Sequence, residues 1–86
     1  MKAITLKFYA SHDDARNIEA WINEGDRRRA ISYSSPQAAP LEYVEARRSG
    51  LWPRRVTAEG DSLHVLIDLM IRFPAIASTA VAEPQK

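Results

Sequence analysis

Residues 4–24 read ITLKFYASHDDARNIEAWINE, and they contain a boundary between a strand and a helix. Apolar and polar side chains alternate up to Tyr9, and this period of two predicts a strand with one buried face. Ser11 precedes Asp14 by three residues, which is typical of a helix N-terminus. A helix that starts there places its apolar residues on one face, and Gly25 supplies its stop. The sequence therefore predicts a first strand followed by an amphipathic helix.

Three shorter elements are predicted in the middle of the chain. Residues 30–34 fit a second strand. Pro40 is well placed as the first residue of a second helix, which runs to Gly50. Residues 56–62 fit a third strand that enters a tight turn.

The most regular alternation of apolar residues runs from Leu63 to Phe73 and predicts a final strand. Leu66 and Met70 lie between the alternating positions, so the second face of that strand is also partly apolar. Helices or a second copy of the chain must cover this face, and for so short a chain we favour a homodimer. We predict that residues 74–86 form a flexible C-terminal tail.

The sequence thus predicts one α+β domain over residues 1–73, with two helices, a small, mainly antiparallel sheet and the order β-α-β-α-β-β. A chain of 86 residues is too short for a two-domain enzyme. Because it contains no cysteine, it has neither a thiolate metal site nor a disulfide. Asp68 and Arg72 interrupt the longest apolar run, which is too short to span a membrane. Lys7 leaves no apolar core for a signal peptide, so we expect a cytoplasmic protein.

Positive charge is concentrated in the middle of the chain, although the net charge is only +1. Residues 27–55 hold seven arginines and two glutamates, a local excess of five positive charges. Guanidinium groups bind phosphate through two parallel hydrogen bonds. We therefore predict a surface that binds nucleic acid or an acidic protein, with Trp52 as its best single contact residue. Its residues are Arg27, Arg28, Arg29, Arg47, Arg48, Trp52, Arg54 and Arg55. The alternative, a solvated face balanced by nearby acids, stays open.

Residues 2–31 resemble the start of a ribbon-helix-helix DNA-binding protein, with a strand, a helix to Glu24 and a turn through Gly25. The resemblance implies a strand that pairs between protomers and enters the major groove, and a second helix that completes the dimer. Residues 32–36 end in a proline, which would stop that second helix early.

A second segment resembles the entry into the sheet of the RelE/YoeB-type toxins, which cleave messenger RNA. It consists of Pro40-Leu41 and residues 49–57, SGLWPRRVT. The helix-then-sheet order of the C-terminal half is also similar. Ala39 stands where the family has an acidic residue, and the family's later arginine and its His-Tyr ending are missing. The resemblance therefore implies such a scaffold without its catalytic set.

Residues suited to catalysis are few. His12 fits an exposed helix end, and His64 fits a half-buried strand position near Asp68, for which a structural ion pair is expected. No nucleophile elbow, glycine-rich phosphate loop or metal-ligand spacing occurs. We therefore predict a non-catalytic binding protein with no catalytic residue, metal or cofactor. Two alternatives remain: a RelE/YoeB-like toxin scaffold, and a protein-interaction module of mobile-element or phage origin that acts through the last strand.

Overall fold

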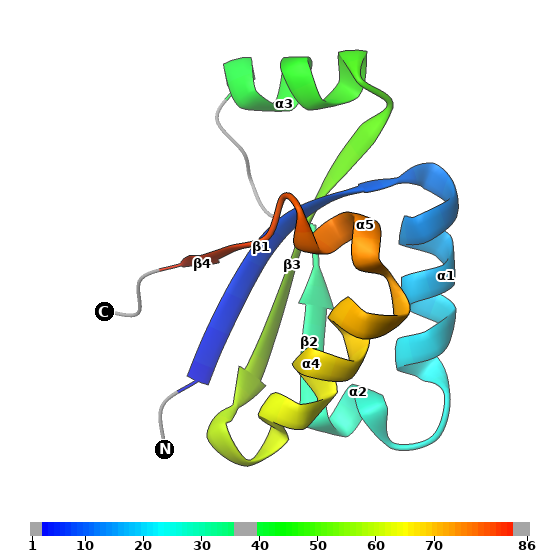
Figure 1. Ribbon diagram of the computed structural model, residues 1–86, viewed down its shortest axis with the longest axis vertical. Helices are drawn as coiled ribbons and strands as arrows, with labels where there is room; N and C mark the ends of the chain where they lie inside the picture. The colour runs from blue at the N-terminus through cyan, green and yellow to red at the C-terminus, as the bar shows by residue number, and fades with distance from the viewer. Residues whose placement is uncertain (1–2, 36–39, 84–86) are drawn as a thin grey trace.

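Two nine-residue strands form the centre of the sheet in the computed structural model (Figure 1). These strands, β1 (Ala3–Ser11) and β3 (Leu51–Glu59), pair antiparallel along their whole length. The short strands β2 (Ile31–Ser34) and β4 (Val81–Glu83) add to their outer edges, also antiparallel, and give the order β2-β3-β1-β4. The predicted α+β class with a mainly antiparallel sheet is confirmed.

Helices pack on one face of this sheet, and one further helix projects beyond its end (Figure 1). The structure describes residues 3–35 and 40–83. Within them the helices are α1 (His12–Asn23), α2 (Arg27–Ala30), α3 (Pro40–Arg48), α4 (Leu63–Arg72) and α5 (Pro74–Ala77), with a 3-10 turn at Gly60–Ser62. None of the helices in these residues is long and apolar enough to cross a lipid bilayer.

The junction of β1 and α1 follows the sequence prediction. The Ser11 hydroxyl accepts a hydrogen bond from the backbone N–H of Asp14 at 3.1 Å and so caps the helix. Asp13 and Asp14 in the first turn are favoured by the positive end of the helix dipole. Gly25 follows the helix with a φ of 56°, a left-handed conformation that glycine adopts most easily.

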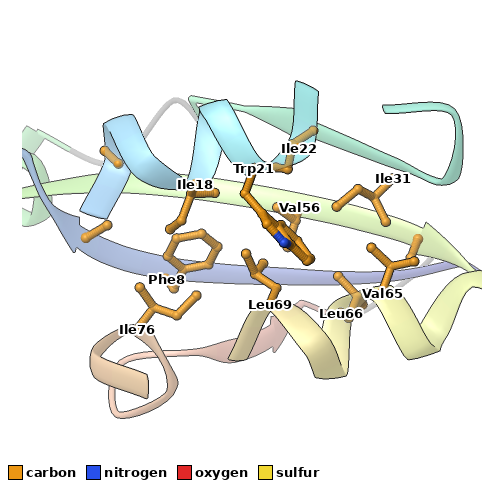
Figure 2. Packing of buried hydrophobic residues seen from close by; sticks show 13 residues of the cluster. Phe8, Ile18, Trp21, Ile22, Ile31, Val56, Val65, Leu66, Leu69 and Ile76 are labelled. Atoms are coloured by element: carbon orange, nitrogen blue, oxygen red, sulfur yellow. The ribbon is translucent and has the colours of Figure 1, made fainter. Parts of the chain in front are cut away.

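The core lies between the sheet and the helices α1, α4 and α5 (Figure 2). Phe8 on β1 and Val56 on β3 point toward these helices because alternate residues of a strand share a face. Trp21 on α1 meets Phe73 edge to face, with ring centroids 6.4 Å apart. The largest fully buried side chains are Phe8, Ile18, Ile22, Val56, Leu69 and Ile76.

Residues 63–72 form the helix α4, and the prediction of a final strand there was wrong. Their apolar residues also fit a helical period, since Leu66, Leu69 and Phe73 recur at intervals of three and four. In the structure Val65, Leu66 and Leu69 are buried, whereas Ile67 and Ile71 are exposed. A strand would have placed Leu69 and Ile71 on the same face, so burial follows the helical period.

The predicted element order and the predicted two helices also differ from the structure, because α4 replaces the last strand and because α2, α5 and β4 were not predicted. The strand that the interaction-module alternative invokes is therefore a helix in the structure. Residues 74–83, which the sequence assigns to a tail, contain α5 and β4, and Ile76 of α5 is only 1% exposed. β4 pairs with β1 at Thr5–Lys7. Both edges of β1 are therefore paired within the chain, unlike the strand that the ribbon-helix-helix resemblance implies.

Candidate anion-binding site

The three arginine clusters lie on different elements. Arg27, Arg28 and Arg29 form most of α2, whereas Arg47 and Arg48 end α3. Arg54 and Arg55 lie inside β3, which begins at Leu51 and not at residue 56 as the sequence predicted. As neighbours on a strand, these last two point to opposite faces of the sheet. Not all residues of the predicted surface therefore lie on one face of the sheet.

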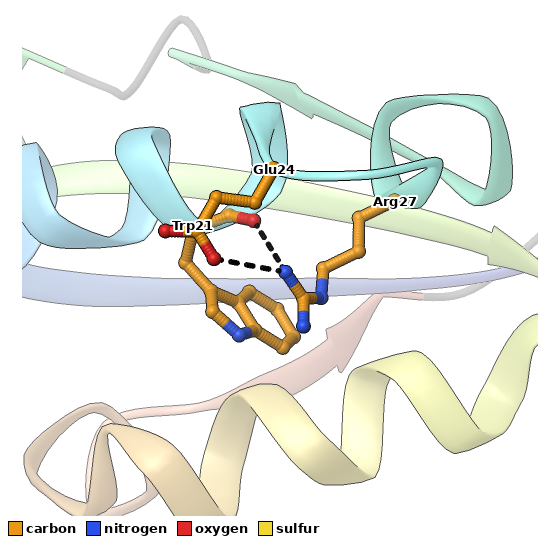
Figure 3. A network of polar contacts seen from close by, with 3 residues as sticks. All are labelled: Trp21, Glu24 and Arg27. Carbon is orange, nitrogen blue, oxygen red and sulfur yellow. Dashed lines mark hydrogen bonds and ion pairs between the residues drawn. The ribbon is translucent and has the colours of Figure 1, made fainter.

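The arginines of α2 contact the C-terminal end of α1 (Figure 3). The Arg27 guanidinium lies over the Trp21 ring, 4.3 Å from its centroid, and donates a hydrogen bond to the Trp21 carbonyl at 3.1 Å. It also forms an ion pair with Glu24 at 3.4 Å. Arg28 donates to the Asn23 side chain at 2.6 Å, and Arg29 is exposed. Arg27 and Arg28 thus each have hydrogen-bond partners on α1 or in the turn that follows it.

Arg55 also has a local partner. It lies on the sheet face opposite α1 and α4, and its Nε is 3.1 Å from the carboxylate of Glu83 on β4. Because β1 lies between β3 and β4, this ion pair crosses the intervening strand. The pairing lowers the positive charge that Arg55 offers to a ligand.

Arg47 and Arg54 are instead arranged around Trp52. The guanidinium carbon of Arg47 lies 3.5 Å from the centroid of the Trp52 ring, and that of Arg54 lies 5.7 Å from it. Gly50, with a φ of 73°, turns the chain between α3 and β3, so that the end of α3 lies next to the start of the strand. Among the described residues, neither arginine has an ion pair with a carboxylate.

Backbone and side-chain acceptors fix both guanidinium groups. Arg47 donates from Nη1 to the carbonyl of Leu51 at 3.3 Å. Arg54 donates from Nη1 to the carbonyl of Pro53 at 2.8 Å and from Nε to the Tyr33 hydroxyl at 3.1 Å. An arginine has five N–H donors, so each group keeps donors for a ligand. The two arginines are thus held in place with hydrogen-bonding capacity to spare.

A pocket of about 160 Å³ opens beside Trp52 and Arg54, several times the volume that one water needs. Its other wall is one flank of α1, where residues at intervals of three and four face the strand. We call the pocket's polar residues and the adjoining arginine the Trp52 site: His12, Arg16, Glu19, Arg47, Trp52 and Arg54. Three arginines and one glutamate give this site two net positive charges.

The sequence interpretation missed part of this site. It placed His12 at an exposed helix end, which the structure bears out, but gave it no neighbours across the chain. Arg16 and Glu19 were not considered. The available signal was the spacing of positions 12, 15, 16 and 19, which places them on one side of a helix.

The remaining residues that the sequence singled out lie elsewhere. His64 and Asp68 are exposed on α4, so the half-buried strand position expected for His64 was wrong. Arg48 is exposed at the end of α3. Among the described residues Asp68 forms no ion pair.

Tyr33 is a sensitive reporter of the Trp52 site. Burial raises the pKa of its phenol above the usual value of 10.0, while the charge and hydrogen bond of Arg54 oppose this rise. We expect one tyrosine to ionise above pH 10.0 in an absorbance titration, and Tyr33→Phe to remove this component. The pKa of Tyr33 is higher in the folded protein than in the unfolded chain. The contribution of Tyr33 to stability is therefore present below pH 10.0 and is lost as the pH rises through the folded-state pKa. A titration that is unchanged in Tyr33→Phe would contradict the assignment.

Comparison with known proteins gives no relative: no family model, curated protein or solved structure matches the chain.

Proposed function

We propose that this protein is a non-catalytic binding protein that contacts phosphate groups of nucleic acid through the Trp52 site. The observation that carries the proposal is the placement of Arg47 and Arg54 around one indole ring, with no carboxylate bonded to either among the described residues. Arg16 lines the pocket next to them. We place the protein in the cytoplasm, where nucleic acids are abundant.

Trp52 acts in this proposal as a platform for cations. An arginine over an indole face is stabilised by the ring's electrons, by about 0.5–1 kcal/mol at exposed sites. Stacking on Trp52 and a hydrogen bond to Leu51 restrict Arg47, and hydrogen bonds to Pro53 and Tyr33 restrict Arg54, before a ligand arrives. Less conformational entropy is then lost on binding than with freely mobile arginines.

Phosphate fits the site better than an acidic protein segment does. The pocket is small, and two arginines, Arg16 and Arg54, line it. A phosphate concentrates charge on oxygens that match the planar fork of arginine, whereas carboxylates on a protein surface are spread over many residues. Contacts to phosphate alone confer little preference for base sequence.

Fluorescence anisotropy with labelled single-stranded RNA and DNA oligonucleotides tests this proposal. We expect binding that weakens as salt rises from about 50 to 200 mM, because each neutralised phosphate adds about −0.7 to the slope of log K against log salt. Two or three contacts predict a slope of about −1.4 to −2. No binding at the lowest salt, or affinity independent of salt, would contradict the proposal, and salt-sensitive binding to an acidic peptide alone would favour the protein partner.

RNA cleavage is a second candidate because His12 and Glu19 line the same pocket as Arg16 and Arg54. Histidine is the side chain that most often transfers protons in enzyme catalysis, and glutamate can also serve as a general acid or base. RNA recovered intact from the binding experiment supports a binding protein. RNA that is shortened by the wild-type protein but not by His12→Ala supports the cleavage activity.

A further inference from the structure

The outward side of α4 carries an apolar stripe that the fold leaves uncovered. Ile67 is 54% exposed and Ile71 is 73% exposed, one helical turn apart. At 100° per residue both point directly away from the buried side of the helix, which is formed by Val65, Leu66 and Leu69. Large aliphatic side chains in such a row favour contact with a further surface.

Opposite charges accompany this stripe on one flank. Asp68 and Arg72 follow Ile67 and Ile71 by one residue each, so they lie about 100° around the helix from them. Both are exposed, and neither forms an ion pair among the described residues. The flank thus holds one acid and one base, separated by a single helical turn.

We propose that this face of α4 binds the same face of a second copy of the chain, with the two helices antiparallel. A twofold axis perpendicular to the helices, near the level of Leu69 and Met70, places Ile67 of each copy beside Ile71 of the other. The same axis places the charged flanks side by side, with Asp68 of each copy next to Arg72 of the other. A parallel pair would place these flanks on opposite sides of the interface.

Self-complementarity is the reason for choosing a second copy as the occupant. One axis matches the apolar pair and the charge pair at the same time, and it forms two intermolecular ion pairs from residues that are unpaired within the described chain. A helix of ten residues is about 15 Å long, so the contact is small. Interfaces of this size are weak and transient, and we expect dimers only at high concentration. The inference does not depend on the proposed function.

Charge-exchange variants provide the test, and sedimentation equilibrium measures the mass of each. At about 1 mM protein we expect a wild-type mass well above that of the monomer, 9.7 kDa. Asp68→Arg places like charges together and Arg72→Asp does the same, so each variant alone should remain monomeric. In an equal mixture of the two variants every pair is again opposite in charge, and the dimer should return.

Glu45→Arg, an exposed position on α3, gives the same change of charge away from α4 and should dimerise like the wild type. Circular dichroism checks that each variant is folded, and the exposure of Asp68 and Arg72 makes unfolding unexpected. A monomeric wild type at about 1 mM, single variants that dimerise as well as the wild type, or a mixture that stays monomeric would each overturn the inference.

Discussion

Arg54→Ala will weaken oligonucleotide binding about 10- to 100-fold, whereas Arg55→Ala will leave it nearly unchanged. The two positions are neighbours on β3, but Arg54 lines the pocket of the Trp52 site and Arg55 lies on the other face, paired with Glu83. A hydrogen bond to a charged group contributes about 1.5–3 kcal/mol, which sets the expected range for Arg54. Anisotropy at constant salt measures both affinities.

This pair of variants separates a local site from general electrostatic attraction. Each variant removes one positive charge, so a diffuse attraction would weaken equally in both. The loss of a partly exposed ion pair in Arg55→Ala is expected to change stability by at most about 1 kcal/mol. Equal losses of affinity in the two variants would contradict the Trp52 site as the point of contact.

Leu69→Ala will reduce the free energy of unfolding by about 2–5 kcal/mol, which is the usual result of truncating a fully buried leucine. Leu69 is 0% exposed and packs within the core. Ile71→Ala should change stability by no more than about 0.5 kcal/mol because Ile71 is 73% exposed. Urea denaturation at low protein concentration, where self-association is negligible, measures both values.

The comparison tests whether residues 63–72 form a helix. In a strand Leu69 and Ile71 lie on the same face, and both truncations would destabilise the protein by similar amounts. In a helix they point in nearly opposite directions. Similar losses for the two variants would therefore contradict the assignment of α4.

The sequence predicted the N-terminal part of the fold because local signals agree there. Residues 4–10 have one clear period, Ser11 is a good N-cap, and Gly25 suits the end of a helix. The same local rules apply in the folded protein, so no tertiary contact needed to override them. The α+β class followed from the whole predicted order of strands and helices, and it holds although the last of those strands is the helix α4.

Residues 63–73 were misinterpreted because their apolar residues fit both periods. Leu63, Val65 and Ile67 alternate as in a strand, while Leu66, Leu69 and Phe73 recur as in a helix. Short apolar segments cannot be distinguished by period alone. Leu66 and Met70 were the signal for a helix. In a strand they lie on the second face, and a further covering surface has to be assumed to bury them.

The site was harder to predict than the fold because residues that are close in sequence can have side chains that point in different directions. Arg54 and Arg55 are adjacent but face opposite sides of the sheet, and Arg47 reaches Trp52 only through the turn at Gly50. The contribution of Arg16 depends on how α1 lies against β3. Such relations follow from strand register and helix packing, which composition and charge clusters do not encode.

Chemical-shift mapping by NMR tests the proposed Trp52 site most directly, with a short single-stranded RNA titrated into isotope-labelled protein. We predict that the largest changes occur at the indole N–H of Trp52 and the Nε–H of Arg54, while Arg28 and Arg55 change little. Changes centred on α2 or on the sheet face that carries Arg55, with the Trp52 signals unmoved, would contradict phosphate binding at the Trp52 site.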